Sequence, residues 1–327
     1  MRLQTVIQAV RDKVNDPDEK YWSDVEIVRW ISHHARQLFR AKAQADRSYG
    51  RVQHQMLASD EDRIQANILE EMQRYHFPSW VYKIYGVRDL SAGTGKQGAL
   101  IDYVEHPRDT HKGWFLSGDR TIDLSKFDAA IDIEIDCAKL PPVLHYGTID
   151  SPSTARNELR FDSSPVDGAT TPNAFELSWE KDAYVGLEVE ITSGSTETTN
   201  RRGFVTTIVS HDQVYDNDLA TPAWVTRCTV FPKWPTVPQV GDTYELHVPL
   251  DESNYEYVAS RVARSLFHKT RNIDGVAVVE SVMAEGHDAY LAGLRPRQEQ
   301  VPGFLVDPDS AGYGGFNPDK DYSDEGF

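Results

Sequence analysis

The sequence has few cysteines, and its charge is mostly of one sign. Its two cysteines, Cys137 and Cys228, lie far apart, which excludes a disulfide-rich scaffold and a paired-cysteine zinc or redox motif. Lys and Arg number 34 against 51 Asp and Glu, a formal net charge of −17, so the surface as a whole repels a phosphate backbone. No apolar run approaches the length of a membrane span, and the N-terminus lacks the apolar core of a signal peptide. With 327 residues, 39% of them hydrophobic, we expect a soluble protein of one large or two ordinary domains.

The first 78 residues show the period of α-helices. One helix is predicted up to Asn15-Asp16-Pro17, and a second begins at Ser23, where Glu26 completes a capping box and Trp22 packs from outside. Side chains expected to pack the second helix are Ile27, Trp30, Ile31, His34, Ala35 and Leu38. A third helix is predicted over residues 52–75, with Met56, Ile64, Ile68 and Met72 in its core and Pro78 after it.

The period changes to two after Pro78, which predicts strands near residues 80–85, 99–105, 113–116, 120–124 and 129–136. In the last of these, Asp132, Glu134 and Asp136 alternate with apolar residues, so we expect one packed face and one solvated acidic face. Residues 145–250 contain further short strands separated by turn residues, which predicts a sandwich or barrel. Their expected positions are residues 158–161, 174–179, 186–192, 203–210, 224–231 and 243–249.

Helical spacing returns at Asp251, where Ser253 offers a cap and Val258, Val262 and Leu266 form the packing face. A last helix is predicted over about residues 274–291. Its expected inward side chains are Val278, Val282, Met283 and Tyr290. Residues 299–327 hold seven acidic residues against one lysine, together with three prolines and five glycines, so they do not fold alone. Their aromatic residues, Phe304, Tyr313, Phe316, Tyr322 and Phe327, suit an extended docking arm.

The fold class expected from these patterns is α+β: a helical bundle with a large inserted antiparallel β region and an extended C-terminal arm. Residues 1–78 and 251–292 would form the helical body, residues 79–144 a small sheet of β-hairpins, residues 145–250 the inserted sandwich or barrel, and residues 293–327 the arm.

No motif in the sequence predicts catalysis, a metal or a cofactor. The glycine-rich loop around Lys96 lacks the residues of a phosphate loop, because Gln97 stands where Ser or Thr would hold Mg²⁺. His33 and His34 lack the spacing of a helical zinc motif, and neither a nucleophile elbow nor a Cys–His signature is present. We therefore expect no enzyme activity.

The segment Tyr21-Trp22-Ser23-Asp24-Val25-Glu26-Ile27-Val28-Arg29-Trp30-Ile31, after a short helix, resembles the opening of the head-to-tail adaptor (connector) proteins of tailed viruses. The run from Gly113-Trp114-Phe115 to Leu140-Pro141-Pro142, and the blocks Tyr184–Gly194, Arg201–Val205 and Val237–Leu246, resemble parts of virion proteins. The resemblance implies a ring-forming helical body, commonly of twelve copies, that binds the portal protein through its C-terminal arm. It also implies tail or neck proteins as partners and a place in the virion neck after assembly in the host cytoplasm, with no membrane and no sequence-specific DNA contact. The β region here is larger than the resemblance implies.

In this reading, Asp132, Glu134 and Asp136 line the channel and repel the phosphates of passing genomic DNA. Two alternatives remain open. A carbohydrate-binding or carbohydrate-cleaving β protein would use Trp179, Trp224 and Trp234 as a stacking platform, whereas core packing is the simpler role for these rings. A tail or neck protein stacked below the adaptor is the other.

Overall fold

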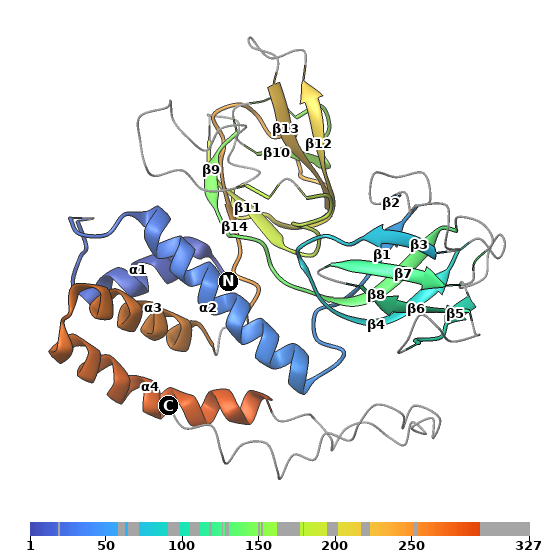
Figure 1. Ribbon diagram of the computed structural model, residues 1–327. Coiled ribbons are helices and arrows are strands. Elements are labelled where there is room, and N and C mark those ends of the chain that lie inside the picture. The colour runs from blue at the N-terminus through green and yellow to red at the C-terminus, as the bar shows by residue number, and fades with distance from the viewer. Residues whose placement is uncertain are drawn as a thin grey trace, which may run out of the picture. The chain divides into compact units, whose positions relative to one another are not determined.

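The computed structural model describes most of the chain from residue 1 to residue 294. The described ranges are 1–18, 20–57, 63–64, 72–90, 99–104, 112–117, 120–125, 127, 131–149, 151, 153–161, 177–178, 180–194, 202–216, 223–250 and 254–294. Residues 1–294 form one compact unit, and residues 295–327, all but the first two residues of the predicted arm, lie outside the described part. The fold is α+β, with four helices and antiparallel sheets in the described residues (Figure 1).

Helices from the two ends of the described chain pack together. They are α1 (Leu3–Val14), α2 (Asp24–Ala45), α3 (Tyr255–Thr270) and α4 (Ile273–Leu294), and α3 contacts each of the other three. Ser23 caps α2 as predicted, since its Oγ accepts from Glu26 N at 3.3 Å, whereas the Glu26 carboxylate pairs with Lys269 of α3. Side chains predicted to pack these helices and found fully buried are Ile27, Ile31, Leu38, Val258, Val262 and Leu266. Trp22 is also buried, and the half-buried Trp30 stacks on His34 at 5.9 Å between ring centroids.

The described strands form three antiparallel sheets. The first has the order β1-β8-β4-β5, from β1 (Arg51–Met56), β8 (Ile133–Lys139), β4 (Val81–Asp89) and β5 (Ala99–Ile101). The second has the order β2-β3-β7-β6, from β2 (Arg63–Ile64), β3 (Met72–His76), β7 (Thr121–Ser125) and β6 (Gly113–Leu116). The third has the order β10-β13-β12-β11-β14-β9, from β10 (Glu158–Arg160), β13 (Ala223–Phe231), β12 (Val205–Asp216), β11 (Glu188–Ser193), β14 (Thr243–Leu246) and β9 (Tyr146–Thr148). The strands predicted near residues 158–161, 186–192, 203–210, 224–231 and 243–249 are confirmed. Residues 177 and 178, the described part of the strand predicted at 174–179, are not in a strand, and β9 was not predicted.

The third predicted helix, over residues 52–75, is wrong. The chain there forms β1, β2 and β3, and β1 pairs with β8 in the register Arg51↔Ala138 to Met56↔Ile133. Met56 is fully buried, as predicted, but it lies in a strand and not in a helix. Pairing with β8, some eighty residues further along the chain, determines the conformation of residues 51–56. It outweighs a helical spacing that rests on only a few apolar positions.

The inward face predicted for α4 is also wrong for Val278 and Val282. Val279 is 5% exposed and buried, whereas Val278 and Val282 are 66% and 44% exposed. Met283 packs against the core as expected, and the side chain of Tyr290 lies outside the described residues. The helix is apolar on more than one side, so spacing alone did not identify the side that packs.

The acidic strand does not present one solvated face. Asp136 is 5% exposed and its carboxylate pairs with Arg51, while Asp132 and Glu134 are half-buried. The strand β8 lies between β1 and β4, and both of its faces are covered toward its C-terminal end. The expectation of a solvated side chain is therefore wrong for Asp136, which serves as the counter-ion of Arg51.

Candidate functional site

A cluster of charged side chains joins the start of α1 to the third sheet. Glu190 of β11 lies opposite Glu245 of β14 in the sheet register. Glu188 is two positions before Glu190 in β11, and His247 is two positions after Glu245, just past the end of β14. Alternate side chains of a strand lie on one face, so these four gather on one side of the sheet. Arg2, just before α1, reaches the same face. We call these five residues the N-terminal charge cluster.

Arg2 is the cation of this cluster. Its guanidinium donates to both carboxylate oxygens of Glu190, with Nε at 2.8 Å from Oε2, and its Nε lies 3.8 Å from Glu245 Oε1. Backbone contacts hold the segment in place, because Val248 N donates to Met1 O at 2.8 Å. Gln4 N also donates to Glu245 Oε2 at 3.1 Å. The N-terminal segment is thereby fixed to the end of β14, which is far away in the sequence.

His247 lies between two carboxylates. Its Nε2 is 3.1 Å from Glu190 Oε2, and its Nδ1 is 3.2 Å from Glu188 Oε2. A neutral ring donates to one of these carboxylates, and a protonated ring donates to both. Burial, with the nearby charge of Glu190, raises the pKa of Glu245, while the Gln4 N–H, His247 and Arg2 act in the opposite direction. A negative charge on Glu245 is therefore costly to bury, and the Gln4 N–H, His247 and Arg2 stabilise it.

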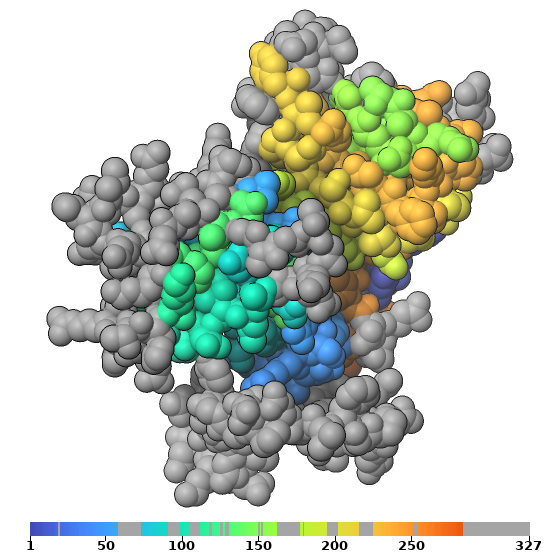
Figure 2. Space-filling model, turned by 90° about the vertical axis from the view of Figure 1, so that its right-hand side faces the viewer, coloured from blue at the N-terminus to red at the C-terminus, as the bar shows by residue number. Residues whose placement is uncertain are grey.

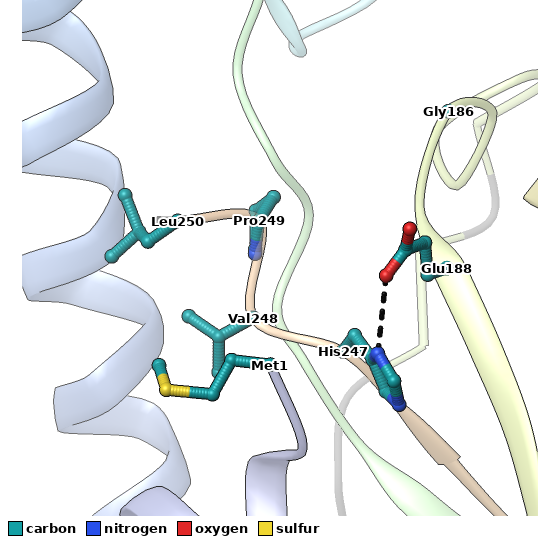
Figure 3. A pocket seen from close by; sticks show the side chains of 7 residues that line it. All are labelled: Met1, Gly186, Glu188, His247, Val248, Pro249 and Leu250. Carbon is teal, nitrogen blue, oxygen red and sulfur yellow. Dashed lines mark hydrogen bonds and ion pairs between the residues drawn. The ribbon is translucent and has the colours of Figure 1, made fainter. Parts of the chain in front are cut away.

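A pocket of about 250 Å³ borders the cluster, and Figure 3 shows Glu188 and His247 joined across its wall. It is lined by Met1, Gly186, Glu188, His247, Val248, Pro249 and Leu250. Ligand atoms of Glu190, Glu245 and His247 lie within 4.8 Å of one another, a donor set that a divalent cation accepts. The guanidinium of Arg2 already holds the Glu190 carboxylate, so the geometry matches an ion-paired anchor for α1.

A second buried junction joins the first sheet to the third. Lys139, at the end of β8, is 7% exposed, and its Nζ donates to the carbonyl oxygens of Val185, at 2.8 Å, and Asp182. The ammonium lies 4.9 Å from the centre of the Trp80 ring, whose Nε1 donates to Lys181 O at 3.0 Å. Burial lowers the pKa of Lys139 to about 7, although the nearby charge of Asp182 acts to raise it. The turn before β11 is thus fixed from the first sheet.

Two histidines are buried at the third sheet, His145 just before β9 and His211 within β12. The His145 ring is fully buried beside Phe161, Tyr184 and Tyr244, and its Nδ1 lies 3.2 Å from the Tyr244 hydroxyl. His211 of β12 is 1% exposed and meets Tyr184 edge to face at 4.8 Å. Burial lowers the pKa of His145 to about 3 and that of His211 to about 4. Both rings are therefore neutral core components at physiological pH.

The residues singled out from the sequence do not meet at one site. The arm residues Phe304, Tyr313, Phe316, Tyr322 and Phe327 lie outside the described residues. Trp234 is fully buried and cannot stack on a sugar, while Trp179 and the Trp224 side chain also lie outside the described part. The charge cluster and the Lys139 junction were not predicted, because their members come from separate elements and form no local motif.

Comparison with protein-family models, with curated proteins and with solved structures finds no significant match for this chain. Among the described residues, no helix is both long enough and apolar enough to cross a membrane.

Proposed function

We propose that the chain is a structural virion protein, an adaptor subunit that forms a ring between the portal and the tail and continues the DNA channel. Its helical bundle, α1 to α4, would be the ring-forming body, with the β region inserted between α2 and α3 and the arm after α4. The proposal rests on the resemblance of residues 21–31 and the later blocks to adaptor proteins, and on one structural observation.

That observation is the outer face of α4. Val278 and Val282, one turn apart, are 66% and 44% exposed, with the exposed small residues Ala277 and Ser281 beside them. Residues four apart lie on one side of a helix, so Val278 lies beside Val282 and the two valines give this strip its apolar surface. We call these four residues the α4 strip. Contiguous exposed apolar surface marks a protein interface, and a neighbouring copy of the ring would cover it.

The two buried junctions support the same role. Arg2 and Glu190 tie α1 to the third sheet, and Lys139 ties the first sheet to the turn before β11. A ring subunit keeps its lateral faces in register when its parts are fixed to one another. In this proposal, Arg2, Glu190 and Lys139 have a structural role, which is to hold the parts of the subunit together.

The acidity of the chain suits a channel through which DNA passes. A net charge of −17 discourages adhesion of phosphates, and the half-buried Asp132 and Glu134 remain candidates for the channel wall. DNA would pass without sequence-specific contacts. The protein would reside in the virion neck with the portal and the tail or neck proteins as partners.

Particle imaging of the protein mixed with the portal protein of the same virus tests this proposal. We expect full-length chain to add a ring to the portal, and chain that stops at Arg297 to lose this binding while its residues 1–294 stay folded, as circular dichroism would report. Glu substitution of Val278 and Val282 should abolish the ring. A full-length protein that stays monomeric and ignores the portal would contradict the proposal.

A further inference from the structure

One surface of this acidic chain is strongly basic. Residues 36–52 and 81–85 contain six basic residues against one carboxylate, Asp46. The basic residues are Arg36, Arg40, Lys42, Arg47, Arg51 and Lys83. The two stretches meet where the end of α2 contacts β4, since Gln44 Nε2 donates to the Tyr82 hydroxyl at 2.9 Å. In Figure 2 the blue end of α2 lies next to the teal strands of the sheets.

Three tyrosines hold the cations of this surface in place. Tyr49, Tyr82 and Tyr85 are half-buried and pack against a small apolar cluster. The members of that cluster are Phe39, Ala43, Ala138 and Leu140. Arg40 lies 5.5 Å from the centre of the Tyr82 ring, and Lys83 lies 5.7 Å from that of Tyr85. The rings are fixed by the fold, so the positions of these cations are preformed.

Three of the cations are available to a ligand. Arg40, Arg47 and Lys83 are exposed and form no ion pair within the described residues. Arg47 belongs to the same surface, because its charge acts on the hydroxyl of Tyr85. The other basic residues here are paired, hydrogen-bonded or buried. We call Arg40, Arg47, Lys83 and the three tyrosines the basic tyrosine patch.

The composition of the patch favours a phosphate backbone over a protein partner. A protein interface has an apolar core inside a polar rim. None of the exposed large hydrophobic side chains of the described residues lies in residues 36–52 or 81–85, and the Tyr82 and Tyr85 rings carry cations. The patch therefore offers positive charge and N–H donors, which phosphates accept without an apolar contact.

The charge of the whole chain makes this surface distinct. Residues 36–52 and 81–85 together carry a net charge of +5, within a chain whose net charge is −17. A phosphate backbone is therefore repelled by the chain as a whole and attracted to this surface. The acidic remainder restricts where DNA can lie, and it does not prevent DNA from binding at the patch.

We propose that the basic tyrosine patch binds the phosphate backbone of duplex DNA through Arg40, Arg47 and Lys83. Contacts to phosphates carry no information on base sequence, so every duplex binds alike. The inference deepens the proposed function by naming the surface that meets DNA in the virion neck. It rests on that function only for the source of the DNA, because the contact itself needs neither a ring nor a portal.

The salt dependence of DNA binding by the full-length chain tests the proposal, with the anisotropy of a fluorescently labelled short duplex as the readout. Three neutralised phosphates give a plot of log association constant against log salt concentration a slope of about −2.7. The association constant should therefore fall about 40-fold between about 0.05 M and about 0.2 M salt. Two duplexes of different base sequence should give the same values.

Charge variants assign this slope to the patch. Arg40→Gln/Lys83→Gln should reduce it to about −0.9, because one of the three cations remains. Arg40→Lys/Lys83→Arg keeps both charges and should keep the slope of the parent. The control Arg202→Gln/Lys233→Gln removes the same charge at exposed positions beside the third sheet and should also keep it. Circular dichroism verifies that each variant is folded.

The outcomes separate this inference from the proposed function. No binding at about 0.05 M salt, or an equal slope in Arg40→Gln/Lys83→Gln and the control, overturns the inference even if the portal gains its ring. Displacement of the duplex by a polyglutamate peptide at equal charge concentration also overturns it, because the patch is then a site for an acidic protein segment. A chain that binds DNA as expected and ignores the portal contradicts the proposed function alone.

Discussion

Arg2 and Glu190 form a bidentate ion pair across 188 positions of sequence, and the Glu190 side chain is 1% exposed. A buried carboxylate that loses its partner is left with an uncompensated charge, which costs more than the pair contributes when intact. The Arg2 side chain is 54% exposed, so when it is removed water can take over part of the stabilisation that it gives to Glu190.

Arg2→Ala should therefore lower the free energy of unfolding by about 2 kcal/mol. Urea denaturation followed by circular dichroism measures the change, with Arg202→Ala as the exposed control, expected within about 0.5 kcal/mol of the parent. If the two variants are equally stable, the N-terminal charge cluster does not anchor α1.

The two faces of the C-terminal helices give a matched pair of valines. Val262 of α3 is fully buried among the helices, whereas Val278 of α4 is 66% exposed. Val262→Ala should cost about 1 to 3 kcal/mol through lost burial and an unfilled cavity, and Val278→Ala should cost less than about 0.5 kcal/mol in the monomer. Thermal or urea unfolding distinguishes them, and an equal loss from Val278→Ala would show that the α4 strip is covered within one chain.

Acid should unfold this protein through its buried histidines. His145 and His211 have pKa values of about 3 and about 4 because burial disfavours the charged ring, below the value of about 6.5 of an unfolded chain. The unfolded chain therefore binds more protons below about pH 6.5. The stability present above that pH is lost as the pH falls toward 4.

His211→Phe tests this directly, because it removes one titrating ring and keeps an apolar ring in its place. The difference in unfolding free energy between pH 7 and pH 4.5 should shrink by on the order of 2 kcal/mol relative to the parent. His268→Phe, at an exposed position of α3, is the control and should leave the slope unchanged. An unaltered slope in His211→Phe would show that its ring is protonated without cost.

Both thiols should be unreactive in the folded protein. Burial raises the pKa of Cys137 to about 12, and the Cys228 thiol is fully buried with its pKa raised as well. A disulfide reagent such as dithionitrobenzoate at pH 8 should modify neither cysteine until denaturant unfolds the chain, because the thiolate is the reacting form. Rapid modification of native protein would contradict the burial of these strands.

Local chemistry was enough to predict much of the fold. The Ser23 cap, the packing face of α2 and the strand β4 follow from side chains that lie near one another in sequence. The strand β1 could not be predicted in this way. Its conformation depends on pairing with β8, and nothing in residues 51–56 indicates that partner.

The charged sites could be predicted least. Arg2, Glu190 and His247 come from three elements, and Glu190 looks like any alternating acidic residue of an exposed strand until Glu245 lies beside it. The prediction that Asp136 is solvated was wrong for the same reason, because its partner Arg51 lies far from it in the sequence.

Mass photometry of the full-length chain mixed with its portal tests the central claim most directly, with the α4 strip as the variable. The account predicts a ring of subunits on the portal for the unmodified protein. It predicts the same ring for the control Leu100→Glu/Val240→Glu, which alters two exposed apolar residues elsewhere, and no ring for Val278→Glu/Val282→Glu. A ring that forms equally well with Val278→Glu/Val282→Glu, or no assembly by any of the three proteins, would contradict it.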